Sequence, residues 1–191
     1  GENLAGVSPE TIDQTRRRAA EALLDARVAA GHWEGELSSS ALSTATAVFA
    51  LHRCEPRRHA ERVRAGVNWL TDHQNADGGW GDTTLSYSNI STTVLVWASL
   101  SVVQGEQAAD AAAARAERWL QREAGSVEPG ALAAAVTRRY GKDRTFSVPI
   151  LTMASLAGRL GPPEQPETWR HVRQLPFELA ALPRAWFSRL N

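Results

Sequence analysis

The sequence has few of the residues that mark several common protein classes. It contains one cysteine, one methionine and one lysine among 191 residues, and its formal net charge is zero. Because Cys54 has no partner in the chain for an internal disulfide, we expect a reducing, cytoplasmic location. Neutral charge gives no support to a nucleic-acid partner. No run of eighteen apolar residues is present and the first residues carry no signal-peptide pattern, so we expect no transmembrane helix.

Tryptophan, by contrast, is abundant, with seven residues that recur in similar contexts. A shift of about 47 residues lays Trp80 on Trp33 and brings "GGWGDTTLSYSNISTT" beside "GHWEGELSSSALSTA". A third, partial copy is "RAERWLQREAG", in which Trp119 and the leucine after it echo Trp69 and Leu70. Units of this length are typical of stacked helical hairpins or of an α/α barrel.

Apolar residues at helical spacing support the same interpretation. They predict helices around residues 39–54 and 89–104, with Ser and Thr before each run as N-terminal caps. A further run around 146–157 is apolar on nearly every side, which predicts a helix that is buried all round or lines an apolar cavity. We therefore predict an all-α fold of about eight helices, a partial, toroid-like α/α barrel of helical hairpin repeats.

The stretch "RAGVNWLTDHQNADGGW" (64–80) predicts a helix that runs into a tight turn. The glycines after Asp77 permit the positive φ angles of a chain reversal. Trp80 can then fold back over the end of the helix, while Gln74 can bond backbone groups left unpaired there. Each part of the stretch thus has a structural role.

The arrangement resembles the QW motif of the squalene–hopene cyclase and oxidosqualene cyclase family. That motif consists of a basic residue, a small residue, an aromatic residue followed by Leu, then Gln and finally G-x-W. The complete copy here consists of Arg64, Ala65, Trp69, Leu70, Gln74, Gly78 and Trp80. The copy ending in Trp33 has Arg27 where its glutamine would stand, and the copy containing Trp119 has neither the glutamine nor G-x-W in the register of Trp69.

Residues 8–190 resemble the N-terminal third of a bacterial squalene–hopene cyclase, which implies several expectations. In that family the region belongs to one of two α-barrel domains, so we expect residues 1–191 to form one all-helical domain, an incomplete barrel. The family protonates its polyene substrate with a D-x-D-D aspartate in the other domain, and no such motif occurs here. We therefore expect this chain to be a piece of a larger cyclase with no catalytic residue of its own, inactive alone. The resemblance implies no cofactor, a squalene-like isoprenoid ligand for the full-length protein, and peripheral contact with the inner membrane face.

Candidate substrate-lining residues lie on the apolar run and on the helix predicted around 89–104. Phe146, Ile150 and Met153 can share one wall of a pocket, and Trp97 lies inside the helix predicted at 89–104. An aromatic ring could stabilise a carbocation by about 0.5–2 kcal/mol. The same residues could equally be plain core, and for the motif tryptophans the core interpretation is favoured.

Other interpretations remain beside the cyclase. A short helical-repeat module that binds an isoprenoid or a protein would keep the same motif. A zinc site at His52 and Cys54 lacks further ligands, so we predict no metal. A glycan-processing enzyme would need a pair of carboxylates about 5–10 Å apart, for which the sequence offers no candidate. The apolar stretch near the C-terminus predicts a patch that packs on the rest of a cyclase, self-associates or meets lipid; it contains Phe177, Leu179, Leu182, Trp186 and Phe187.

Overall fold

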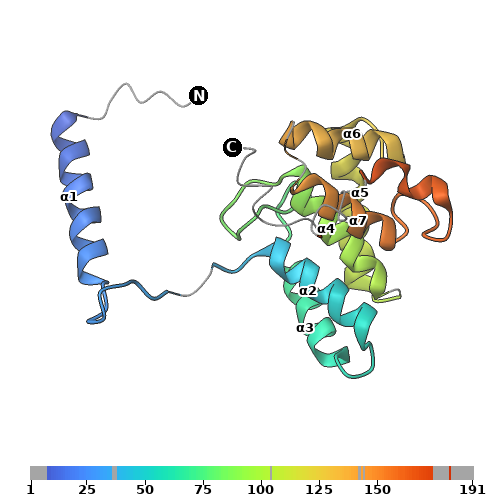
Figure 1. Ribbon diagram of the computed structural model, residues 1–191, viewed down its shortest axis with the longest axis horizontal. Coiled ribbons are helices and arrows are strands. Elements are labelled where there is room, and N and C mark those ends of the chain that lie inside the picture. Colours follow the sequence, from blue (N-terminus) through green and yellow to red (C-terminus); the bar gives the residue numbers. More distant parts are fainter. Residues whose placement is uncertain are drawn as a thin grey trace. The chain divides into compact units, whose positions relative to one another are not determined.

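A computed structural model describes residues 8–35, 38–103, 105–141, 143, 145–173 and 181 (Figure 1). The C-terminal apolar stretch named above lies outside these residues. Contacts divide the chain into two units, Gly1–Ser38 and Ser39–Asn191, and each is described by itself. The prediction of one domain over residues 1–191 therefore stays a prediction.

The described part of the first unit is one helix and the turn that follows it. Helix α1 spans Pro9–Asp25 and begins where Ser8 accepts a hydrogen bond from the backbone N–H of Thr11. None of its residues is buried within the structure. The chain then reverses through Gly31, whose φ is 86°, to an isolated bridge between Arg27 and Trp33.

The second unit contains the other six α-helices and two short 3-10 helices. The α-helices are α2 (Ala41–Cys54), α3 (Ala60–Asp72), α4 (Ile90–Ser99), α5 (Gln107–Ala124), α6 (Pro129–Tyr140) and α7 (Ser147–Leu156). The 3-10 helices are η1 (Leu100–Val102) and η2 (Pro166–His171). No strand occurs among the described residues beyond isolated bridges, and the predicted all-α, toroid-like class of helical hairpins is confirmed.

Helix α4 is the centre of the second unit. It packs against α2, α5, α6 and α7 (Figure 1), and all its residues after Ile90 are buried. Three of the four serines and threonines of α4 have an acceptor for the hydroxyl: Ser99 donates to the carbonyl of Val96, Thr93 to the carbonyl of Trp80 and Thr92 to the carboxylate of Asp82. The run at 146–157, predicted to be buried all round or to line an apolar cavity, forms α7, in which Pro149 and Leu156 are exposed and Ile150 and Met153 line an apolar pocket.

Helix caps follow the predicted positions with one difference in residue type. Ser40 accepts a hydrogen bond from the N–H of Ser43 at the start of α2, as predicted. At the start of α4 the cap is Asn89, which accepts from the N–H of Thr92, rather than a serine or threonine. Both caps satisfy one of the amide groups that a helix leaves unpaired at its first turn.

Candidate functional site

The turn after α3, residues 73–80, brings most of the motif residues together; we call it the α3 turn. Gln74 closes it by donating from Nε2 to the carbonyl of Gly78 at 2.7 Å and to that of Ala112 on α5 at 3.0 Å. Gly78 has a φ of 95°, and a Cβ added there would lie 2.9 Å from the carbonyl oxygen of Arg115. Only glycine fits this position, since both the backbone angle and the close approach of α5 exclude a side chain.

Trp80 lies at the end of the α3 turn and is 1% exposed. Its indole N–H donates to the carbonyl of Leu70 at 2.8 Å, and its backbone N–H donates to Thr93 on α4. The ring therefore covers the last turn of α3 and joins that helix to the central one. Burial of so large a side chain with its polar atom paired is a major contribution to stability.

Helix α5 docks on the α3 turn through three donors. Arg115 donates from Nε to Oε1 of Gln74 at 2.6 Å, and the indole of Trp119 donates to Oδ2 of Asp77 at 3.0 Å. Arg122 donates to the backbone carbonyl of Asp77 at 2.8 Å. Apart from the Gln74 amide, which donates to Ala112, the α3 turn thus supplies acceptors and α5 supplies the matching donors.

Asp77 is the acidic residue of this junction. Partial burial, the largest single influence, raises its pKa, but hydrogen bonds from Gly79, Ser88 and Trp119 and the charge of Arg122 outweigh it, so the pKa of Asp77 lies below its ordinary value. A carboxylate that accepts several hydrogen bonds is held in its charged form. Asp77 therefore acts as a fixed anion between the α3 turn and α5.

The turn after α1, residues 26–33, repeats the hydrogen bonds that close the α3 turn, at an offset of 47 residues; we call it the α1 turn. The indole of Trp33 donates to the carbonyl of Leu23 at 2.5 Å, ten residues back, as Trp80 does to Leu70. Arg27 donates from Nε to the carbonyl of Gly31 at 2.9 Å, where the α3 turn has Gln74 and Gly78.

Three backbone bonds recur as well. The N–H of residue 31 or 78 bonds the carbonyl of residue 28 or 75, at 2.9 Å in both turns. In the α1 turn the N–H of Val28 donates to the carbonyl of His32, and in the α3 turn the N–H of Asn75 donates to that of Gly79. Likewise, the N–H of Ala26 donates to the carbonyl of Ala22, and the N–H of His73 donates to that of Trp69. The copy that has lost the glutamine has therefore kept its geometry, because an arginine makes the same bond.

In the third copy, a glutamine occurs three residues earlier than the sequence comparison had placed it. Gln121 donates to the carbonyl of Gly125, four residues on, as Gln74 does to Gly78, and Gly125 also has a positive φ, 78°. Gln121 lies inside α5, whereas Gln74 follows the end of α3. Aligning Trp119 with Trp69 does not place Gln121 at the position of Gln74, whereas the 47-residue offset of the first two copies does.

The remaining motif residues lie on α3, where Leu70 is fully buried and the other three are at least partly exposed. Arg64 and Ala65 are exposed, and no side-chain hydrogen bond of Arg64 occurs among the described residues. Trp69 is half-buried and stacks on His73 with ring centroids 4.1 Å apart. The sequence did not single out Arg115 or Asp77, although both lie inside quoted motif copies, because their bonds join segments about 40 residues apart.

An apolar pocket opens between α2, α4, α6 and α7, with a volume of about 190 Å³. It contains three of the four predicted substrate-lining residues, and its lining is Leu42, Thr46, Leu95, Tyr140, Phe146, Pro149, Ile150 and Met153. Ile150 and Met153 are buried, whereas Phe146 is 57% exposed and stacks on Tyr140 at 5.6 Å. Thr46 already donates its hydroxyl to the carbonyl of Leu42. The pocket therefore suits an apolar group, and no acid lines it.

Trp97, the fourth predicted lining residue, lies in a different pocket with Asp110, Glu117 and Arg159. The guanidinium of Arg159 lies over its ring, 4.1 Å from the centroid, and donates to the Trp97 carbonyl. Burial lowers the pKa of Arg159, and the charge of Glu117 opposes that shift. Because the chain's own cation occupies this face of the indole, Trp97 does not join the apolar pocket.

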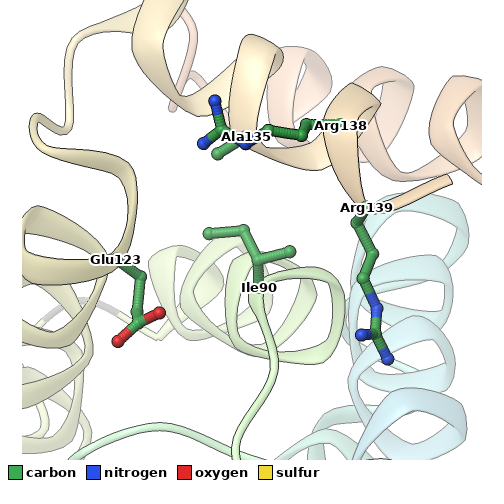
Figure 2. A pocket seen from close by; sticks show the side chains of 5 residues that line it. All are labelled: Ile90, Glu123, Ala135, Arg138 and Arg139. Atoms are coloured by element: carbon green, nitrogen blue, oxygen red, sulfur yellow. The ribbon is translucent and has the colours of Figure 1, made fainter. Parts of the chain in front are cut away.

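A more polar pocket of about 210 Å³ lies where α4 begins, between α5 and α6 (Figure 2). Figure 2 shows Ile90 in its centre, with Glu123 and Arg139 on opposite sides. Arg138 completes the charged lining, and no ion pair joins these groups within the described part of the chain. Its exposed, separated charges do not form an acid–base pair.

No cluster of three or more metal-binding side chains occurs in the described ranges, and Cys54 is exposed. None of the helices in those ranges is both long and apolar enough to cross a lipid bilayer.

Comparison with known families gives one match, to the squalene-hopene cyclase N-terminal domain, over residues 17–151. The chain belongs to this family. The match covers the α1 turn, the α3 turn and all of helices α2 to α6. No solved structure matches the chain significantly.

Proposed function

We propose that the chain is the N-terminal segment of a squalene–hopene-cyclase-like triterpene cyclase that shapes an apolar isoprenoid cavity and is inactive alone. Membership of the family supports a terpene-cyclase-like N-terminal region. The observation that carries the cavity part is the lining of the apolar pocket, in which the described residues contribute two polar side-chain groups, the hydroxyls of Thr46 and Tyr140. Such a lining favours a hydrocarbon and offers nothing that could protonate an alkene.

In this proposal, the buried side chains of α4 and α7 hold the pocket wall. Leu95, Ile150 and Met153 are each less than a tenth exposed, so their positions are set by core packing. The exposed ring of Phe146 and the half-buried ring of Tyr140 form the rim. The acid that begins cyclisation comes from another part of the full-length cyclase, and the pocket contributes shape and exclusion of water.

The test is the binding of radiolabelled squalene, presented in detergent micelles and measured by equilibrium dialysis. Phe146→Asp places a charge at the pocket rim, and we expect it to weaken binding about tenfold, because an apolar ligand cannot solvate a carboxylate. Leu156→Asp is the matched control, since Leu156 is exposed on the same helix but does not line the pocket. Product analysis of the same samples should show no cyclised squalene.

Equal effects of the two substitutions, or no binding by the parent chain, would refute the isoprenoid pocket. Binding without dependence on Phe146 would place the ligand elsewhere. A cyclised product that the chain forms, and that a control preparation of inactivated chain does not form, would refute the statement that the chain is inactive alone. A repeat module that binds only proteins would bind no squalene.

A further inference from the structure

The apolar pocket follows one side of α7. Phe146, Pro149, Ile150 and Met153 all line it, and the last three stand three, four and seven residues after the first. Residues at this spacing share one face of a helix, and seven residues of helix are roughly 10 Å long. Helices α2, α4 and α6 of the same unit supply the rest of the lining. The pocket is therefore complete without any residue of the first unit.

The two ends of this face differ in exposure. Phe146 and Pro149 are exposed, whereas Ile150 and Met153 are buried. Leu95, which lines the pocket from α4, is buried as well. A ligand thus enters past Phe146 and reaches the side chain of Met153 at the closed end.

The volume of the pocket limits what it can hold. An apolar cavity of about 150 Å³ holds one benzene molecule, so a pocket of about 190 Å³ has room for roughly eight carbon atoms. This corresponds to one to two isoprene units, roughly a quarter of a triterpene chain. The described residues of the lining include no charged side chain, so burial of an ionised head group here would be unfavourable.

We propose, on the basis of the isoprenoid pocket proposed above, that this pocket is a subsite for the hydrocarbon end of a longer isoprenoid chain. It holds the last one to two isoprene units, and the rest of the ligand leaves past Phe146. Met153 is the residue that sets the length of chain admitted, because it closes the buried end.

The character of Met153 suits this role. It is the one methionine of the sequence, and its unbranched, flexible side chain adapts to the shape of an apolar neighbour. Met153→Ala would remove most of that side chain and extend the pocket beyond Ile150, since a buried site relaxes only in part after such a truncation. The variant should therefore admit a longer end of the ligand.

The test is a series of prenyl ethers of tetraethylene glycol, used below their micelle-forming concentrations and measured by isothermal titration calorimetry with the full chain. The dimethylallyl, geranyl, farnesyl and geranylgeranyl members contain one, two, three and four isoprene units on the same uncharged head. We expect the dissociation constant to fall at least about tenfold from dimethylallyl to geranyl, because each newly buried methylene favours binding. From geranyl to geranylgeranyl it should fall less than about threefold, since the added units lie outside the pocket.

Variants of α7 test the role of Met153. In Met153→Ala the farnesyl ether should bind at least about tenfold more tightly than the geranyl ether, because the extended pocket buries a further unit. Leu156→Ala is the matched control, since Leu156 lies on the same helix but does not line the pocket, and it should keep the limit of the parent chain. Ile150→Val removes a single methylene from the buried end; it should shift the limit in the same direction by less, and it decides the question if circular dichroism shows Met153→Ala to be unfolded.

Each outcome separates this subsite from the isoprenoid pocket itself. Affinity that rises steadily through four isoprene units would overturn the terminal subsite and leave the isoprenoid pocket standing. A limit that is the same in the folded Met153→Ala or Ile150→Val variant and in the parent would overturn the role of Met153. Binding of no member of the series, or binding that Phe146→Asp does not weaken, would overturn the isoprenoid pocket and the subsite with it.

Discussion

The α1 turn and the α3 turn have the same hydrogen-bonded framework and very different surroundings. Both close with an indole bonded ten residues back and a side chain bonded to a glycine carbonyl four residues on. Within its own unit, the α3 turn buries its tryptophan and receives α5, whereas Trp33 is 48% exposed within the unit that contains the α1 turn. The comparison shows that the motif closes a turn by itself, while its capacity to join helices depends on a few side chains that face outward.

The largest expected effect is the loss of the buried ring. Trp80→Ala should lower the free energy of unfolding by about 3–5 kcal/mol, as for other buried aromatic residues. Trp33→Ala removes one hydrogen bond from a half-exposed ring and should cost about 1 kcal/mol. Urea unfolding followed by far-UV circular dichroism measures both. Equal losses would mean that closing the turn, rather than burial, dominates the contribution of these tryptophans.

The stability losses caused by Gly→Ala substitutions in the two turns should differ by a smaller amount. Gly31→Ala meets only the flexible end of Arg27, 3.2 Å away, so its cost should be the backbone strain of about 1–2 kcal/mol. Gly78→Ala adds a contact of 2.9 Å with the backbone of Arg115, and the displacement of α5 should raise the loss to about 2–4 kcal/mol. Thermal unfolding of the two variants provides the comparison. If both melt alike, α5 is not seated closely on the α3 turn.

The smallest effect concerns pH and the carboxylate found only in the α3 turn. Since the pKa of Asp77 is lower in the folded chain than the unfolded value of about 3.9, its contribution is complete above that value and is lost as the pH falls through the folded pKa. Asp77→Asn should therefore reduce stability at pH 7 and weaken the further loss as the pH falls below about 4. Asp72→Asn is the control, because Asp72 makes no side-chain hydrogen bond among the described residues. Parallel pH profiles of parent and Asp77→Asn would contradict this role.

Local features of the fold could be predicted from the sequence because they depend on short spacings. The helix at 41–54 and the positive φ of Gly78 follow from short local patterns, and the 47-residue repeat follows from the recurrence of one such pattern. The bond made by Gln121 follows from the same repeat, but the register through Trp119 concealed it. The exposure of Phe146 at a pocket rim does not follow from its place in an apolar run.

Contacts between distant segments could not be predicted in the same way. The pairing of Arg115 with Gln74 and of Trp119 with Asp77 has no periodic signal, since each pair depends on how two helices meet. The complete burial of α4 was also beyond the pattern, because its serines and threonines read as polar until their hydroxyl partners are known. For the candidate site, the apolar character of 146–157 was predictable, but the separation of Trp97 from the other lining residues was not.

The spacing of these bonds also has a consequence for chain entropy. Gln74 reaches Gly78 across four residues and Arg115 across forty-one. Because the entropic cost of closing a loop grows with the logarithm of its length, the longer closure costs about 2 kcal/mol more than the shorter one. The turn can therefore form at little cost in an otherwise unfolded segment, and the docking of α5 is the step that joins segments distant in the sequence.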